Sequence, residues 1–242
     1  MTRLYHALFG MYAILVFALC VLFSLFVAVL VPGLERRRRL VASAARASFL
    51  LSGVRPDIMG LNNLPEQACV VVANHASYLD GILLKGFLPA RFSFVIKGEM
   101  RNVPIAHFLM RRSGARFVER FKSSESARDA RQIVKAARSG ESLGFFPEGT
   151  FLEERGVGRF RAGAFMAAIK GGMPVVPIAI SGTREMLGAG RALPRPTPIR
   201  IDILEPILPD DPAYGDHHSL AETARQRILA VLDEPDLLAT LD

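Results

Sequence analysis

Two short motifs carry residue types that can do chemistry. Residues 74–80 (NHASYLD) place His75 five positions before Asp80, and residues 146–150 (FPEGT) place Glu148 beside Gly149 directly after an apolar run. A histidine can act as a general base, and a carboxylate bonded to its other ring nitrogen can hold the required tautomer. A glycine lets the backbone of a turn approach a ligand closely. Together the motifs predict a general base with an orienting acid, next to a turn that meets a polar substrate.

The spacing of His75 and Asp80 requires a particular local fold. On one continuous helix, residues five apart lie about 140° away from a common face. The two side chains can therefore meet only if a helix begins between them, with His75 on the preceding loop. The run 69–73 predicts a buried parallel strand before that loop, and 79–88 predicts the helix after it. Open α/β sheets place their ligand sites at this end of a strand.

Short apolar runs alternate with helical stretches after Pro56, which is typical of an α/β fold with a mixed, mostly parallel sheet flanked by helices. Besides 69–73, we expect strands at 92–96, 116–118, 143–146, 175–180 and 199–203. We expect further helices at 123–139, 162–170 and 220–232, and a loop at 194–198. The chain then divides into an amino-terminal part, residues 1–55, and an α/β domain, residues 56–242.

The amino-terminal part predicts attachment to the cell inner membrane. No charge interrupts the apolar run from Leu8 to Val31, which as a helix of about 36 Å could cross a hydrocarbon core of roughly 30 Å. A cleaved signal peptide is the alternative, but its apolar core is shorter and follows its positive charge. Here four arginines, residues 36–39, come after the run, so the positive-inside rule puts them and the α/β domain on the cytoplasmic side. Residues 40–54 predict a second helix, either membrane-associated or packed on the domain.

The formal net charge of +7 suits an anionic membrane surface or an anionic substrate. Nucleic acid is the competing partner, but the arginines adjoin the apolar run and no nucleic-acid-binding motif is present, so we expect no such partner. Cys20 lies in the apolar run and Cys69 in a predicted strand, which argues against a disulfide. No Cys/His cluster has zinc spacing, and we expect no metal.

The two motifs resemble the first and third sequence blocks of the glycerolipid acyltransferases, the family typified by 1-acyl-sn-glycerol-3-phosphate acyltransferase. Residues 114–120 (GARFVER) are similar to the second block, and residues 175–180 (VVPIAI) are similar to the fourth. Residues 97–100, followed by Pro104, resemble the stretch between the first two blocks. The blocks stand in the family's order between Pro65 and Ile207.

The resemblance implies transfer of a fatty acyl chain to the sn-2 hydroxyl of lysophosphatidic acid, which gives phosphatidic acid. The acyl donor would be acyl-CoA or acyl-carrier protein, a substrate rather than a bound cofactor. His75 would be the general base and Asp80 its orienting acid, with Arg120 on the acceptor phosphate. The residues expected to bind substrate are Arg120, Glu148, Gly149, Thr150, Lys97 and Arg161.

Three other readings of the sequence stay open. Arg116 and Glu119 differ from the usual second block, so the acceptor could be another lysolipid, such as lyso-ornithine lipid. A lipid hydrolase would need its own nucleophile, and the chain has no Gly-x-Ser-x-Gly elbow. Ser77 lies close to His75 in sequence, but with no second base apparent we expect it to cap a helix. A non-catalytic membrane-binding module would have no need of the His75–Asp80 pair.

Overall fold

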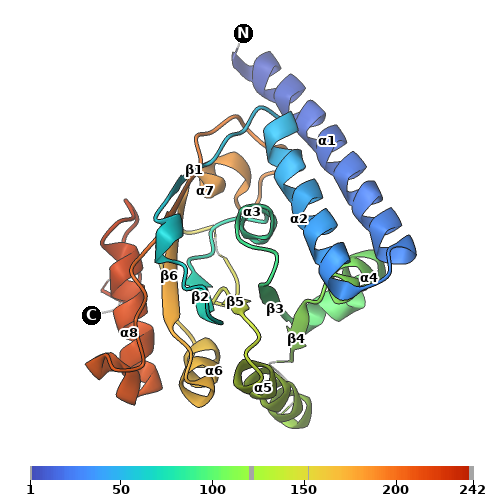
Figure 1. Cartoon of the computed structure of the whole chain (residues 1–242). Helices are drawn as coiled ribbons and strands as arrows, with labels where there is room; N and C mark the ends of the chain where they lie inside the picture. The colour runs from blue at the N-terminus through green and yellow to red at the C-terminus, as the bar shows by residue number, and fades with distance from the viewer. Residues whose placement is uncertain (1, 120–122, 152, 240–242) are drawn as a thin grey trace.

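The computed structural model describes residues 2–119, 123–151 and 153–239. Its strands form a seven-stranded sheet in the order β1-β7-β6-β2-β5-β3-β4 (Figure 1). Neighbouring strands are parallel except β6 and β7, which are antiparallel. The predicted mixed, mostly parallel sheet is therefore confirmed. In chain order the strands are β1 (Asp57–Met59), β2 (Val70–Ala73), β3 (Ser93–Lys97), β4 (Arg116–Val118), β5 (Leu143–Phe145), β6 (Val175–Ser181) and β7 (Arg200–Ile203).

Helices cover both faces of the sheet, as the alternating sequence pattern predicts (Figure 1). Three short 3₁₀ turns, at Leu61–Asn63, Gly98–Asn102 and Pro212–Gly215, complete the described elements. The α-helices are α1 (Thr2–Leu30), α2 (Leu34–Leu51), α3 (Asp80–Phe87), α4 (Pro104–Arg112), α5 (Ser123–Arg138), α6 (Gly163–Gly171), α7 (Thr183–Leu187) and α8 (His217–Leu229).

Strand β2 lies near the middle of the sheet and joins two hydrophobic cores. Successive side chains of a strand point to opposite faces. Val70 and Val72 accordingly pack in the core beneath α5, α6 and α8, whereas Val71 and Ala73 pack in the core beneath α2, α3 and α7. All four residues are buried, so the loop that follows β2 starts from a firmly held position.

Helix α2 begins at Leu34 rather than at residue 40, and the four arginines therefore lie in its first turns. Its contact with α3 is unusually close at Gly86. A Cβ atom at this position would lie 2.7 Å from the backbone nitrogen of Arg46, so only glycine fits. The Arg46 Nε donates a hydrogen bond of 2.8 Å to the Gly86 carbonyl. Helix α2 is thus packed on the domain at this point, whatever its relation to a membrane.

Helix α1 lies beside α2 (Figure 1) and is, in the described part of the chain, the one helix long and apolar enough to cross a membrane. Helix α1 meets this condition by its length and composition alone. Its outward side chains include Leu4, Leu8, Leu15, Leu19, Leu22 and Phe26, all exposed. Its other side packs on the protein: Gly10 lies against Leu193, and Arg112 donates to the Ala28 carbonyl at 2.8 Å.

Candidate active site

The carboxyl end of β2 brings the two predicted catalytic residues together. Helix α3 begins at Asp80, so His75 lies on the loop before it, as the spacing requires. The Nδ1 atom of His75 is 2.9 Å from Oδ2 of Asp80. Asp80 is fully buried, and the His75 side chain is 19% exposed. The carboxylate thus orients the ring through Nδ1 and leaves Nε2 as the basic atom.

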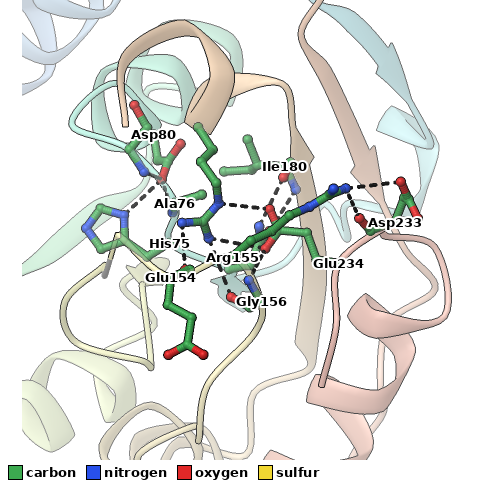
Figure 2. A network of polar contacts seen from close by, with 12 residues as sticks. His75, Ala76, Asp80, Glu154, Arg155, Gly156, Ile180, Asp233 and Glu234 are labelled. Atoms are coloured by element: carbon green, nitrogen blue, oxygen red, sulfur yellow. Dashed lines mark hydrogen bonds and ion pairs between the residues drawn. The ribbon is translucent and has the colours of Figure 1, made fainter. Parts of the chain in front are cut away.

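Asp80 also shapes the loop that carries His75. Its Oδ2 atom accepts hydrogen bonds from the backbone nitrogens of Ala76 (2.7 Å) and Ser77 (2.8 Å), in addition to the imidazole contact (Figure 2). The other carboxylate oxygen, Oδ1, is buried without a partner. Three contacts therefore converge on one oxygen, which fixes the ring of His75 relative to the backbone of the loop.

Two aromatic rings hold the imidazole of His75 in place. Phe146 stacks on it with ring centroids 4.4 Å apart and an interplanar angle of 24°. Phe151 meets it edge-on at 4.8 Å and also contacts Tyr78. The histidine therefore sits at the meeting point of the first and third sequence blocks, with apolar surfaces that limit the access of water.

The side chain of Glu148 forms hydrogen bonds with the backbone where these two sequence blocks meet. Its Oε1 accepts the backbone N–H of His75 at 2.7 Å, and its Oε2 accepts the backbone N–H of Gly158 at 2.9 Å. Burial raises the pKa of the Glu148 carboxyl above its usual range, and the N–H donors of Gly158 and His75 oppose that rise. Both oxygens are engaged inside the protein, so the structure gives Glu148 a positioning role next to the histidine.

A fully buried arginine, Arg225, links the loop around Gly158 to the carboxyl-terminal segment. Arg225 of α8 donates to the Gly158 carbonyl at 2.9 Å and to the Val157 carbonyl at 3.3 Å, and it pairs with Asp236. Each contact holds the backbone of the loop that follows FPEGT. A chain of contacts therefore leads from the carboxyl terminus through Glu148 to the backbone of His75.

A second set of contacts, which includes Glu154, Gly156 and Glu234, holds the same loop (Figure 2). Arg184 of α7 donates to the Glu234 carboxylate at 3.1 Å and to the Glu154 carbonyl at 3.0 Å. The other oxygen of Glu234 accepts the backbone N–H of Gly156 at 3.0 Å. The carboxyl-terminal segment and α7 thus both hold the loop 153–158.

Asn74 and Ser77 have structural contacts of their own. Asn74 is buried, and its side-chain amide exchanges two hydrogen bonds with the backbone of Ile180 in β6. The Ser77 hydroxyl is buried and donates to the Leu187 carbonyl at 2.6 Å, while its oxygen accepts from the Leu79 N–H. The hydroxyl of Ser77 therefore makes both of its hydrogen bonds within the fold, which argues against a role as a nucleophile.

An apolar cavity of about 560 Å³ opens beside the site, between the α1–α2 pair and α3, β3 and α4. Tyr78, Gly81 and Phe146 line the part next to the catalytic loop. Lys85 is the one cation among the described residues that line it. Burial, with a smaller contribution from the charge of Arg38, lowers the pKa of Lys85 from 10.5 to about 8.

The other predicted binding residues lie around the same edge of the sheet. Gly149 has φ = +85°, a conformation that favours glycine, and its N–H donates to the Phe146 carbonyl. Thr150 is exposed next to it. Lys97 is exposed at the end of β3, and the exposed Arg161 lies where its backbone N–H bonds the Pro147 carbonyl. Among the described residues, the side chains of Lys97 and Arg161 do not contact the His75–Asp80 pair. Arg120 lies outside the described residues.

Asp129 and Arg101 position the segment that leads to Arg120, and the sequence motifs did not point to either. The Asp129 carboxylate accepts from the Glu119 N–H and from the Arg101 guanidinium, both at 2.9 Å. The sequence signal that could have identified Asp129 is its place as an acidic residue on the inward side of an amphipathic helix, α5. Within the described ranges, no group of three or more His, Cys, Asp or Glu side chains is placed to hold a metal ion.

Comparison with known proteins decides the family. A family model described as "Acyltransferase" matches residues 55–181, more than half of the chain. The chain belongs to the acyltransferase family. The matched range contains His75, Asp80 and the residues of the FPEGT turn.

Relatives of several kingdoms carry a common name. The chain is 32% identical to the chloroplastic 1-acyl-sn-glycerol-3-phosphate acyltransferase BAT2 of Brassica napus, over 72% of this chain and 50% of that protein. It is 30% identical to the 1-acyl-sn-glycerol-3-phosphate acyltransferase of Pseudomonas aeruginosa, over 70% of this chain and 67% of that one. The chain thus spans half to two thirds of the length of these curated relatives.

A solved structure shares the whole architecture. The crystal structure of PlsC from Thermotoga maritima, a 1-acyl-sn-glycerophosphate acyltransferase, superposes with a TM-score of 0.77 at 25% identity. The match covers 94% of this chain and 95% of that one, so it includes the two amino-terminal helices as well as the sheet.

Proposed function

We propose that this acyltransferase moves a fatty acyl chain from a thioester donor, acyl-CoA or acyl-carrier protein, to the sn-2 hydroxyl of lysophosphatidic acid. The product is phosphatidic acid. The observation that carries the proposal is the His75–Asp80 pair next to an apolar cavity whose lining residue Phe146 stacks on His75, in a chain of the acyltransferase family. The names of the relatives support the choice of acceptor.

In the proposed reaction, Nε2 of His75 takes the proton of the acceptor hydroxyl while its oxygen attacks the thioester carbonyl. Asp80 stabilises the imidazolium through Nδ1, because its carboxylate oxygen already faces that atom at 2.9 Å. Collapse of the tetrahedral intermediate breaks the carbon–sulfur bond. The leaving thiolate then takes the proton from Nε2, which restores the neutral histidine. The base acts directly on the acceptor, which agrees with a Ser77 hydroxyl that is bonded to Leu187.

The acyl chain of the donor would occupy the apolar cavity. Its lining is almost wholly hydrophobic, and Phe146 and Tyr78 connect it to the catalytic loop. A chain buried there would place its carbonyl carbon next to His75. Desolvation of a long acyl chain contributes about 0.8 kcal/mol per CH₂ group, so the cavity offers a large share of the donor affinity.

We also propose that the enzyme works at the inner membrane with its α/β domain facing the cytoplasm. The exposed apolar face of α1 provides the attachment. The contacts of α1 with the protein near both ends, at Gly10 and Ala28, support a helix that enters the bilayer by its outer face beside the domain. A complete crossing, as its length allows, would require α1 to leave these contacts.

Cysteines introduced at residues 4 and 34 separate the two arrangements. A membrane-impermeant thiol reagent reaches both positions from one side of sealed vesicles if α1 enters one leaflet. It reaches them from opposite sides if α1 crosses the bilayer. Cys20, which is partly exposed, should be replaced by alanine in both proteins.

The function is tested by an acyl-transfer assay of the detergent-solubilised chain. Acceptors are lysophosphatidic acid, other lysophospholipids, lyso-ornithine lipid and glycerol 3-phosphate, each with acyl-CoA and with acyl-carrier protein. We expect phosphatidic acid as the main product. A phosphate-free lysolipid used better than lysophosphatidic acid, or release of free fatty acid without transfer, would contradict the proposal.

A further inference from the structure

We propose that a groove between α5 and α6 holds the phosphate-bearing pantetheine arm of the acyl donor, with the phosphate at Lys135, Arg138 and Lys170. This inference rests on the proposed function. The phosphopantetheine arm is common to acyl-CoA and acyl-carrier protein, so the groove would serve either donor.

The groove is a cavity of about 770 Å³ on the face of the sheet opposite to the apolar cavity. Its floor is formed by side chains of β3, β4 and β5 together with Ile133 and Ala164 of the two helices. It shares Val95, Ile96 and Phe146 with the apolar cavity. Because Phe146 stacks on His75, the two spaces meet next to the catalytic base.

The direction of the helices orients the groove. Both α5 and α6 follow one strand of the parallel sheet and precede another, so they run from the carboxyl edge back to the amino edge. Phe146, Pro147 and Arg161 therefore line the end at the active site, and Lys135, Arg138 and Lys170 line the far end. The nine residues of α6 span about 14 Å. An extended pantetheine arm can cover such a distance.

The charge of the far end fits a phosphate. Lys135, Arg138 and Lys170 are exposed, and in the described part of the chain none of them forms an ion pair. Arg131 adds a further exposed cation midway along α5. The Nε of Arg138 donates to the Lys170 carbonyl at 3.3 Å, which brings the ends of the two helices together. Lysine and arginine side chains that converge on one groove can provide charge-assisted hydrogen bonds to phosphate oxygens.

The position of the groove favours a water-soluble donor over a lipid head group. In Figure 1, α5 and α6 lie at the bottom of the molecule, remote from the amino-terminal end of α1 at the top. If α1 enters the bilayer by its exposed face, the far end of the groove opens to the aqueous side. The acyl chain and the phosphate of the donor would then extend to opposite faces of the sheet, with the thioester between them at His75.

The same three cations stand in the last turns of α5 and α6, where positive charge also stabilises the helix ends. A role limited to the helices would change thermal stability without changing the use of the donor. The experiment therefore measures both quantities.

The test compares the full-length, detergent-solubilised enzyme with a variant that carries Lys135→Gln, Arg138→Gln and Lys170→Gln. Arg128→Gln is the matched control, because Arg128 is exposed on α5 and does not line the groove. Steady-state kinetics use acyl-CoA, acyl-dephospho-CoA, acyl-carrier protein and acyl-pantetheine, which has no phosphate. Equilibrium binding of CoA itself and the melting temperature complete the set. Lys170→Glu alone serves if the triple variant does not fold.

We expect the donor KM of the variant to rise about 10-fold or more for acyl-CoA, with the acceptor KM and kcat within about 2-fold of wild type. With acyl-pantetheine, wild type and variant should have equal KM values. A larger effect with acyl-CoA than with acyl-carrier protein would place the additional phosphates of CoA in the groove. An unchanged donor KM, an equal loss with acyl-pantetheine, or a rise in acceptor KM alone would overturn the inference.

Failure of the proposed function has a separate signature. If wild-type enzyme transfers acyl groups to none of the lysolipids, the acceptor assignment fails, and CoA binding still reports on the groove. Weaker CoA binding in the triple variant but not in Arg128→Gln supports the groove, and equal binding in all three proteins overturns it.

Discussion

The cavities on the two faces of the sheet differ in chemistry and share Val95, Ile96 and Phe146. On the side of α1, α2 and α3, a cavity of about 560 Å³ is lined almost entirely by apolar groups, and its one cation among the described residues, Lys85, has a lowered pKa. On the side of α5 and α6, the groove carries exposed, unpaired cations. Phe146 lines both and stacks on His75.

The difference between the apolar cavity and the cationic groove suits a ligand that is hydrophobic at one end and anionic at the other. In the arrangement proposed above, each end would bind to a separate face, and the reactive bond would lie where the faces meet. His75 is only partly exposed and is held by several contacts, whereas the cations of the groove are exposed and, within the described residues, form no ion pair.

The largest effect is expected at the boundary itself. We predict that His75→Ala lowers turnover by at least about 10²-fold, the usual scale of lost general-base catalysis, while the fold stays intact. Steady-state kinetics measure the loss of turnover, and the circular dichroism spectrum reports whether the fold stays intact. His107→Ala is the matched control, because His107 also contacts an aromatic ring, that of Phe117, but lies on α4. Near-normal turnover of His75→Ala would remove the proposed mechanism.

Asp80→Asn should lower turnover by about 10-fold to 10²-fold with little change in the acceptor KM. The asparagine oxygen can still accept from the N–H groups of Ala76 and Ser77, so the loop keeps its shape. The charge that stabilises the imidazolium is lost. Kinetics with varied acceptor concentration check the prediction. A pure rise in KM would place Asp80 in substrate binding instead.

Glu148→Gln should reduce turnover by about 10-fold and destabilise the protein by about 1–3 kcal/mol. Glutamine offers one acceptor oxygen where the structure uses two, and its NH₂ group must face either His75 N–H or Gly158 N–H. Turnover, acceptor KM and the unfolding free energy are the readouts. Direct contact of Glu148 with the acceptor predicts the reverse pattern, a raised acceptor KM with unchanged stability.

The smallest effect concerns the apolar face. Lys85→Met should stabilise the protein by about 1–3 kcal/mol at pH 7, because burial disfavours the protonated amine that prevails there. The folded pKa, about 8, is below the ordinary 10.5, so this cost is present below pH 8 and fades as the pH rises toward 10.5. Denaturation of both proteins at pH 7 and pH 10.5 measures it. An equal difference at the two pH values would contradict the assignment.

The sequence predicted the central strands well because β2, β5 and β6 are buried on both faces and read as apolar runs. Elements with weaker signals were missed. Strand β1 has three residues and helix α7 has five, too few to show a period. Helix α4 begins at Pro104, a residue common in the first turn, but none of its residues is buried. Arginine is a good helix former, which explains why α2 starts before the charged run ends.

The site divides in the same way between local and distant contacts. The pairing of His75 with Asp80 depends on where one helix begins, and the strand pattern before the motif together with the helix pattern after it predicts that start. The hydrogen bond from the His75 backbone to Glu148 joins residues 73 positions apart, and that from Arg225 to Gly158 joins residues 67 apart. No short motif encodes such contacts. Glu148 was therefore expected to bind substrate, whereas its two oxygens are engaged by the protein's own backbone.

The contacts of the arginines at residues 36–39 limit how a water-soluble form of this protein can be made. Arg37 donates to the Arg112 carbonyl, and the largely buried Arg38 pairs with Glu141 and donates to Ser93. Phe49 of α2 is buried in the domain core. Removing the first two helices would strip these contacts, leave Glu141 with fewer partners and open one wall of the apolar cavity. A soluble form is better sought by changing the outward leucines of α1 to polar residues than by truncation.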